Sequence, residues 1–249
     1  MSEILRICGK HAVREAIRSE RGVYKLWLSQ TLNPPILREF QALAKENSIP
    51  VQLVPPQKLN ALLPDTQNQG IVAETGDFTY LEWGEFLDLV QSKENPLILI
   101  LDQIQDPHNL GAIIRSAEAA GVVGVVLAKH SAVGISEVVA KAAAGALEVV
   151  PLTQVTNISR AIEDLKEINV WVMGLDANEG QNIYKGNLTG SLALVIGNEH
   201  KGMRPNVAKH CDLLLHIPMH SSRSLNASVS TGVALFEALR QRDHLTPGK

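Results

Sequence analysis

Short apolar runs and amphipathic segments alternate along most of the chain, most regularly after Pro96. The run LILILD at 97–102 is apolar on both faces, as in a central strand of a parallel sheet. Apolar runs predict further strands at 121–128, 147–152 and 169–176 and within 191–203 and 211–219. Intervening periodic segments predict helices at 109–120, 136–146, 157–167, 204–210 and 226–242. We therefore predict an α/β fold with a parallel sheet that helices cover on both sides.

The first part of the chain predicts a separate, small α/β unit. Strands are expected at 23–29, at 51–54 and at the end of 67–74, with helices at 9–20, 34–47 and 56–63. The acidic segment that follows is interrupted by Gly and Pro and contains one short predicted helix at 82–91. The expected organisation is a domain at 1–75, a linker at 76–96 and a larger domain at 97–249.

Composition is that of an ordinary globular protein, with 45% hydrophobic residues in 249. No apolar run reaches the roughly 18 residues that a membrane span needs, and the N-terminal residues lack the apolar core of a secretion signal. Cys8 and Cys211 have no metal-ligand spacing and are expected to be free thiols in a reducing cytoplasm. We expect no bound metal and no contact with a membrane.

The net charge of −3 gives no general attraction for nucleic acid, so a polyanion-binding surface must be local. Residues 1–76 contain nine Lys and Arg against seven Asp and Glu, whereas the remainder contains fourteen against nineteen. Lys10, Arg14 and Arg18 recur at steps of four and would form a basic stripe that holds RNA phosphates. A solvated helix face with interleaved Glu15 and Glu20 explains the same pattern, and both interpretations stay open.

Candidate chemistry follows the predicted strand ends, where ligands bind in parallel sheets. Asn109 follows an Asp-Pro turn, where it can cap the next helix, and Arg115 points away from the buried face of that helix. Gly197 would let a ligand pack on the backbone, and Glu199 would orient a polar group or pair with Arg115. For Asn109, Arg115 and Glu199 the alternatives are a structural cap, a solvated arginine and a surface charge.

A second candidate segment is SLNAS at 224–228, at the start of the last helix. Ser224 and Asn226 lie where a helix N-terminus offers free backbone N–H groups, and Asn226 is expected to cap them. Capping alone is the alternative. The sequence contains no G-x-G-x-x-G, Walker A, H-E-x-x-H or G-x-S-x-G motif, which weakens the common nucleotide, metal and serine-nucleophile interpretations.

Three motifs together carry a specific resemblance. The segments NLGAIIRSAEAAG, LALVIGNEHKGM and IPM followed by SLNASVSTGVALFEALRQR resemble the successive motifs of the SpoU/TrmH family. Members of that family are RNA ribose 2′-O-methyltransferases that use S-adenosylmethionine. In residues 1–75, CGKHAVREAI and QNQGIVAE resemble the substrate-binding domain of the branch that methylates a guanosine ribose in 23S ribosomal RNA.

The resemblance implies a deep trefoil knot in the C-terminal domain, a homodimer with active sites near its interface, and a cytoplasmic enzyme whose partner is ribosomal RNA. By motif position it implies catalytic and RNA-handling roles for five residues and cofactor contacts for four. The first set is Asn109, Arg115, Glu199, Ser224 and Asn226, and the second is Gly197, Ile217, Leu225 and, beside them, Met219.

Three departures from the family pattern leave alternatives open. His200 stands where Gly is usual, HSSR at 220–223 is one residue short, and Asn68 replaces a His. The first two lie in loops expected around the cofactor, and they motivate the alternative of an RNA-binding member that has lost catalysis. Within the enzyme class, tRNA is the alternative substrate.

Overall fold

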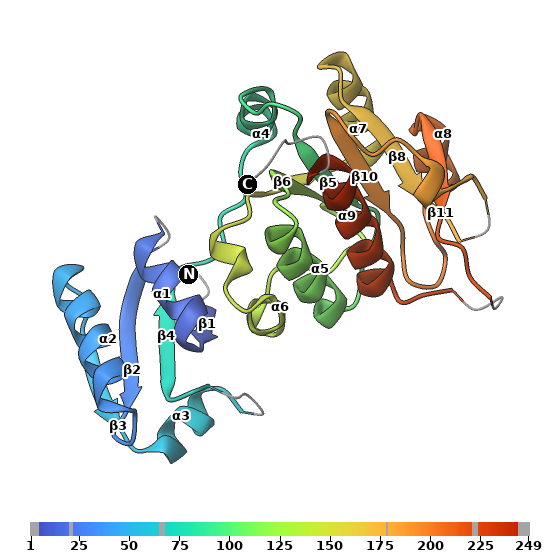
Figure 1. Cartoon of the computed structure of the whole chain (residues 1–249). Coiled ribbons are helices and arrows are strands. Elements are labelled where there is room, and N and C mark those ends of the chain that lie inside the picture. Colours follow the sequence, from blue (N-terminus) through green and yellow to red (C-terminus); the bar gives the residue numbers. More distant parts are fainter. Residues whose placement is uncertain (1–4, 20–21, 65–67, 178, 221–223, 244–249) are drawn as a thin grey trace. The chain divides into compact units, whose positions relative to one another are not determined.

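The computed structural model describes residues 5–19, 22–64, 68–177, 179–220 and 224–243 (Figure 1). The chain divides into two compact units. One comprises Met1–Thr79 with Ile135–Val149, and the other comprises Tyr80–Gly134 with Val150–Lys249. In the described part of the chain, no helix is long and apolar enough to cross a membrane.

The N-terminal unit is built on a four-stranded sheet with the order β1-β4-β2-β3. Its strands are β1 (Leu5–Cys8), β2 (Val23–Ser29), β3 (Val51–Val54) and β4 (Ile71–Thr75). Its first helices are α1 (Lys10–Arg18), α2 (Pro34–Glu46) and α3 (Pro56–Leu62). The apolar pattern predicts these elements except β1, a four-residue edge strand that includes Arg6 and pairs only with β4.

A second segment, far along the chain, also belongs to this unit. Helix α6 (Glu137–Ala143) and the short 3₁₀ helix η1 (Ala146–Glu148) contact β1 and α1. The Arg6 backbone N–H donates to the Glu137 carboxylate at 3.3 Å, and the Ser19 hydroxyl donates to Glu148 at 3.3 Å. The strand expected at 147–152 is wrong, because 146–148 form η1 and the next strand begins only after Pro151, which has no N–H for a ladder.

The C-terminal unit is built on a seven-stranded sheet with the order β7-β6-β5-β10-β8-β11-β9, in which the paired strands run parallel. Its strands are β5 (Leu97–Leu101), β6 (Gly124–Ala128), β7 (Leu152–Val155), β8 (Trp171–Leu175), β9 (Gln181–Asn182), β10 (Leu192–Ile196) and β11 (Leu213–His216). Its helices are α4 (Trp83–Gln91), α5 (Pro107–Ala119), α7 (Ile158–Glu167), α8 (Pro205–His210) and α9 (Ala227–Asp243), with a 3₁₀ turn η2 (Ile183–Lys185). The α/β class with a mostly parallel sheet is confirmed.

Helix α4, expected inside a linker, contributes to the core of this unit. Phe86 and Val90 are buried in the cluster that β5, β6 and α7 also form. Trp83 stacks on Phe86, and its ring N–H donates to Asp164 on α7 at 2.9 Å. The apolar face of the nine-residue helix α4 is thus buried against the sheet.

The central strands β5, β6 and β10 are buried along their whole length. Polar side chains that could bind a ligand are therefore expected beyond the ends of these strands and not within them. Helix α5 follows β5, and α9 packs against α5, so the two helices lie side by side in Figure 1. This arrangement brings the segments after β5 and β10 close to the start of α9.

Candidate active site

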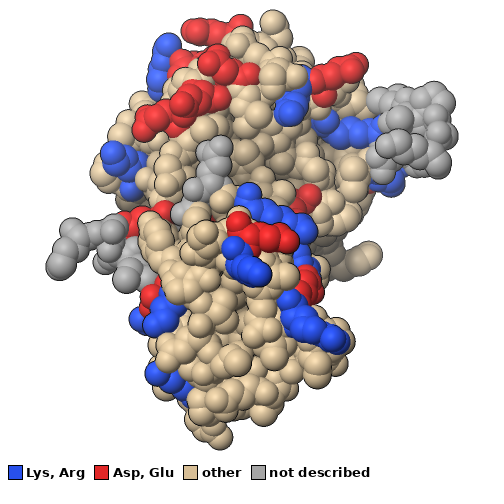
Figure 2. Space-filling view, turned by 90° about the vertical axis from the view of Figure 1, so that its left-hand side faces the viewer, with Lys and Arg blue, Asp and Glu red and all other residues tan. Residues whose placement is uncertain are grey.

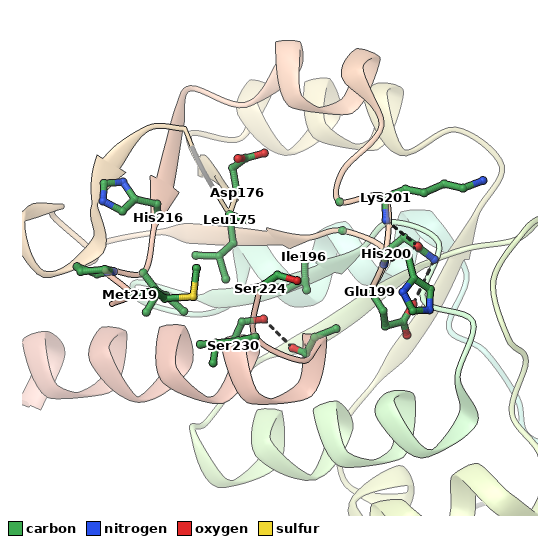
Figure 3. Close-up of a pocket in the computed structure, with 18 residues that line it drawn as sticks. Leu175, Asp176, Ile196, Glu199, His200, Lys201, His216, Met219, Ser224 and Ser230 are labelled. Atoms are coloured by element: carbon green, nitrogen blue, oxygen red, sulfur yellow. Dashed lines mark hydrogen bonds between the residues drawn. The ribbon is translucent and has the colours of Figure 1, made fainter. Parts of the chain in front are cut away.

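A cavity of about 690 Å³ lies at the carboxyl ends of β8, β10 and β11 (Figure 3). Its wall is formed by residues 175–177, 196–202 and 216–219 and by the first residues of α9 with the segment before it. The cavity lies where parallel sheets bind ligands. Four residues predicted to contact a cofactor line it: Gly197, Ile217, Met219 and Leu225.

The cavity lining is largely polar and includes a smaller aliphatic part. Figure 3 shows Met219 and His216 on one side and Glu199 and His200 on the other. Leu175 and Ile196 add aliphatic surface from the strand ends, and Ser224 lies between the two sides. A ligand with one apolar ring and one reactive polar end fits such a lining.

The end of the cavity with Glu199 and His200 is formed by a closed loop at 197–203. Asn198 and Gly202 form an antiparallel bridge, in which each backbone N–H donates to the other carbonyl at 3.0 and 2.9 Å. At Gly197, a Cβ would lie 2.1 Å from the Met203 nitrogen. Glycine is therefore required by the return of the loop itself, and not only by a ligand, as the sequence suggested.

Four side chains from three distant segments form one hydrogen-bond chain at this end. The Asn226 amide donates to the Asn109 carbonyl oxygen at 3.0 Å, and the Asn109 amide donates to Glu199 at 3.1 Å. Asn198 donates to the other Glu199 oxygen at 3.2 Å. The Glu199 carboxylate is thus held from two sides by neutral donors, which fixes its direction without neutralising its charge.

The interpretation of Asn109 as a helix cap is wrong. Helix α5 begins at Pro107, and the Asp106 side chain caps it by accepting the His108 N–H at 2.8 Å. Asn109 lies in the first turn and is only 7% exposed, so its amide is free to bridge Glu199 and Asn226. Asn226 does cap its helix, because its carbonyl oxygen accepts the Ser228 N–H at 2.9 Å.

Arg115 does not line the cavity of its own chain. It is exposed on α5, as its position on the helix predicts. Among the hydrogen bonds and ion pairs of the described residues, none joins Arg115 to Glu199. Within this chain Glu199 holds the amides of Asn109 and Asn198, and its expected roles towards a ligand and towards Arg115 stay predictions. Ser224 lines the cavity beside them.

The predicted basic stripe is partly neutralised within its own unit. Arg14 pairs with Glu39 at 2.6 Å and lies over the Phe40 ring, 5.8 Å from its centroid. Arg18 pairs with Glu15 at 3.3 Å. On the face drawn in Figure 2, basic and acidic side chains likewise alternate in small groups. A role of Lys10, Arg14 and Arg18 in RNA binding stays a prediction.

Two of the three departures from the family pattern have a clear structural setting. Asn68 is buried, donates to Asn60 at 2.8 Å and accepts the Gly70 N–H at 2.9 Å, so it holds the turn before β4. His200 lines the cavity, and its backbone N–H donates to Asn198 at 3.0 Å. Of the shortened segment 220–223, residues 221–223 lie outside the described residues.

Further polar residues at the cavity that the sequence did not single out include Asp176 and Lys201, whereas Asn198 lies in the predicted segment between Gly197 and Glu199. Asn198 is 9% exposed and uses its whole side chain, accepting the His200 and Lys201 N–H groups and donating to Gln103 and Glu199. The sequence feature that indicates Asn198 and Asp176 as site residues is a polar residue within two positions of the end of a predicted strand.

Among the described residues, neither Cys211 nor any group of potential metal ligands forms a second reactive centre. Burial, with a smaller contribution from Asp212, raises the pKa of the Cys211 thiol to about 12, which leaves it protonated and unreactive at neutral pH. Within the described residues, no group of three or more His, Cys, Asp or Glu is arranged to hold a metal ion.

The parallel sheet, the cavity at its carboxyl edge and the carboxylate held by amides define an α/β protein with one ligand site at that edge. Residues 96–236 match the SpoU rRNA Methylase family, and residues 6–81 match the RNA 2′-O ribose methyltransferase substrate binding family. The chain belongs to the SpoU rRNA methylase family.

Known relatives extend over almost the whole chain. It is 42% identical over 247 residues to the 23S rRNA (guanosine-2′-O-)-methyltransferase RlmB of Pseudomonas putida, covering 97% of this chain and 98% of the relative. The SpoU methyltransferase AviRb of Streptomyces viridochromogenes is 25% identical with a TM-score of 0.81, covering 98% and 92%. AviRb has also been solved in complex with AdoMet, at 24% identity and a TM-score of 0.81, covering 97% and 91%.

Proposed function

We propose that this protein is an S-adenosylmethionine-dependent RNA 2′-O-methyltransferase that methylates a guanosine ribose in 23S ribosomal RNA in the cytoplasm. The observation that carries the proposal is the convergence of all three family motifs at one cavity, through the hydrogen bonds that join Asn226, Asn109 and Glu199. The guanosine target follows from the relative in Pseudomonas putida and from a substrate-binding domain of the same kind.

The cavity fits the proposed cofactor. Its volume of about 690 Å³ lies within the range of small-molecule sites, and its lining combines aliphatic side chains with a larger polar part. Gly197, Ile217, Met219 and Leu225 would hold the cofactor from the two loops. When bound, S-adenosylmethionine supplies an electrophilic methyl group on a sulfonium.

The chain's own residues then have a positioning task and an electrostatic one. The ribose 2′-hydroxyl is a poor nucleophile until its proton leaves, and alignment of the oxygen with the methyl group is the main requirement. Glu199, held by Asn109 and Asn198, would orient the ribose, and Ser224 and Asn226 would orient the nucleotide or the cofactor loop. The resemblance gives Arg115 the role of base, but a guanidinium is poorly suited to accept a proton, so an electrostatic role is the easier one. Arg115 would bind the adjacent phosphate and stabilise the developing alkoxide.

We also propose a homodimer, in which Arg115 reaches the cavity of the partner chain. Arg115 does not line the cavity of its own chain, where Lys201 is the lining lysine, so Arg115 would have to act at the cavity of a partner. Three large apolar side chains at or just before α9 are exposed: Leu225 by 38%, Val229 by 51% and Phe236 by 50%. Such a row suits an interface better than solvent. Replacement of Phe236 by Glu should shift sedimentation from dimer to monomer.

The trefoil knot is part of the same proposal and rests on the resemblance. It agrees with a sheet in which β10 lies between β5 and β8, and with the return of α9 to the elements that precede it in the chain. At the end of α9, Arg242 donates to the carbonyls of Leu188, Gly190 and Asn95 at 3.2, 2.6 and 2.7 Å.

The decisive experiment is to map ribose methylation in total RNA from cells with and without this protein. Loss of one 2′-O-methylguanosine in 23S rRNA is expected. Loss of a tRNA methylation instead would establish the alternative substrate. An unchanged map, together with retained RNA binding and no calorimetric heat with S-adenosylmethionine, would contradict the enzyme and favour an RNA-binding member without catalysis.

A further inference from the structure

One fully buried carboxylate lies beside the cavity without lining it. Asp102 directly follows β5 and its side chain is 0% exposed. The Arg204 guanidinium donates from Nε and Nη2 to Asp102 Oδ1, at 2.8 and 2.7 Å. The Arg204 backbone N–H donates to Asp102 Oδ2 at 2.9 Å. Both oxygens of a buried anion are therefore satisfied by one residue, 102 positions away in the sequence.

These contacts fix the C-terminal end of the loop 197–203, since Arg204 is the residue that follows it. The N-terminal end of the loop is held by the residues that follow β5. The Asp102 N–H donates to the Ile196 carbonyl at 2.8 Å, and the Asn198 amide donates to the Gln103 carbonyl at 2.9 Å. Gln103 has a φ of 65°, a conformation that a non-glycine residue keeps only where its surroundings hold it. Residues 102 and 103 thus fix both ends of the loop.

We propose that Asp102 and Arg204 are positioning residues whose ion pair sets the loop 197–203 in its cofactor-binding conformation before any ligand arrives. The proposal deepens the proposed function and rests on it for the identity of the cofactor. The Arg204 side chain is 42% exposed, but its removal leaves the fully buried Asp102 carboxylate without its partner, which costs more than loss of a surface pair. The loop would then lose its anchor while the lining residues stay unchanged in sequence.

The chain offers a matched control on the same sheet. Asp212, just before β11, accepts the Val172 N–H at 2.9 Å and pairs with Lys166 at 2.7 Å. Its chemistry resembles that of Asp102, but Asp212 lies at the amino end of its strand and does not line or anchor the cavity loop. Asp212→Asn removes a strand-end carboxylate of similar role without touching that loop.

The test measures the Kd of S-adenosylmethionine by calorimetry for the full-length protein and for Asp102→Asn, Arg204→Ala and Asp212→Asn. We expect Asp102→Asn and Arg204→Ala each to raise the Kd about tenfold, which corresponds to roughly 1.4 kcal/mol. The double variant should be no worse than either single one, because the two residues act through one pair. Asp212→Asn should leave the Kd within twofold of the original, and Arg204→Lys, which keeps the positive charge, should raise the Kd less than Arg204→Ala does.

A second measurement does not depend on the cofactor. In the ligand-free protein, the backbone amides of His200, Lys201 and Gly202 should exchange hydrogen faster in Arg204→Ala than in the original or in Asp212→Asn. Unchanged exchange and an unchanged Kd in a folded Arg204→Ala protein would overturn the proposal, as would an equal effect of Asp212→Asn. If the unaltered protein fails to bind S-adenosylmethionine, the proposed function falls, while the exchange experiment still decides whether the pair positions the loop.

Discussion

The Asn109 amide lies 3.1 Å from a carboxylate oxygen of Glu199, although the two residues are 90 positions apart in the sequence. One belongs to the first turn of the helix after β5 and the other to the loop after β10. Because β5 and β10 are paired neighbours in the sheet, their following segments leave at the same edge. The contact turns two separate motifs into one site.

Replacement of Asn109 by Asp should lower kcat by roughly ten- to a hundredfold, since it removes a donor to Glu199 and places a second anion beside it. The cofactor Kd should change much less, because Asn109 does not line the cavity. Methyl transfer to an RNA fragment measures both effects. Asn47→Asp, at an exposed amide that donates to Leu43, is the control and should be silent. Normal kcat in Asn109→Asp would show that the hydrogen-bond chain is only structural.

Much of this arrangement could be predicted from local sequence patterns. The elements and contacts that could not be predicted were missed for physical reasons. Apolar patterns predicted β2, α2 and β5 nearly to the residue, because each buries a continuous apolar face. The pattern missed β1 and the assignment of α6 to the N-terminal unit, because both depend on partners far along the chain. The partners of Asn109 and the fixed loop after Gly197 depend on non-local contacts of the same kind, which spacing along one chain does not encode.

Arg115→Ala should abolish methyl transfer while leaving cofactor binding and stability nearly unchanged. The side chain is exposed and does not line its own cavity, so its loss removes phosphate binding and alkoxide stabilisation without creating a void. Glu118→Ala, another exposed change on α5, is the control.

Mixing two inactive variants tests whether Arg115 works across a dimer. Arg115→Ala and Glu199→Ala chains, unfolded and refolded together, should regain about a quarter of the activity if each active site takes Arg115 from one chain and Glu199 from the other. Activity of Arg115→Ala equal to that of the unaltered protein would remove Arg115 from the mechanism. Mixed chains that stay inactive would show that both residues serve the same chain's site.

The basic stripe predicts a change in the salt dependence of RNA binding. Lys10→Ala should reduce the slope of log K against log salt by about one unit if this cation contacts a phosphate. Arg14→Ala and Arg18→Ala should reduce it less, because Arg14 pairs with Glu39 at 2.6 Å and Arg18 with Glu15 at 3.3 Å. Glu39→Gln should have the opposite effect and strengthen binding to a 23S rRNA fragment. Identical slopes in all four variants would leave the stripe as solvated surface.

Gly197→Ala should damage the cofactor loop even without a ligand. The new Cβ would lie 2.1 Å from the Met203 nitrogen and 2.2 Å from the Gly202 carbonyl carbon, so the backbone of the loop must move. We expect a loss of stability of about 1–3 kcal/mol from this overpacking and weaker binding of S-adenosylmethionine. Gly84→Ala in α4, where a Cβ meets nothing within 4 Å, should instead stabilise the protein by roughly 0.5–1 kcal/mol. Equal stability of the two variants, measured by urea unfolding, would contradict this account.

Glu237 should make part of the stability depend on pH. Its carboxylate is 7% exposed and accepts hydrogen bonds from Arg240 and Gln241 at 2.8 Å. The hydrogen bond from Arg240 lowers the pKa of Glu237, and the bond from Gln241 adds to this against the opposing effect of burial. A carboxyl group whose pKa is lower in the folded state contributes stability above its unfolded pKa. That contribution is lost as the pH falls through the folded value.

Glu237→Gln should therefore reduce the free energy of unfolding at pH 7. The difference in this free energy from the original protein should shrink as the pH falls, first through the pKa of Glu237 in the unfolded chain and then through its lower pKa in the folded protein. Urea unfolding at several pH values measures this difference directly. Glu118→Gln, at an exposed position on α5, is the matched control and should show little difference at any pH. A difference for Glu237→Gln that stays constant with pH would mean that its effect comes from packing, and that the bond to Arg240 contributes no charge-dependent stability.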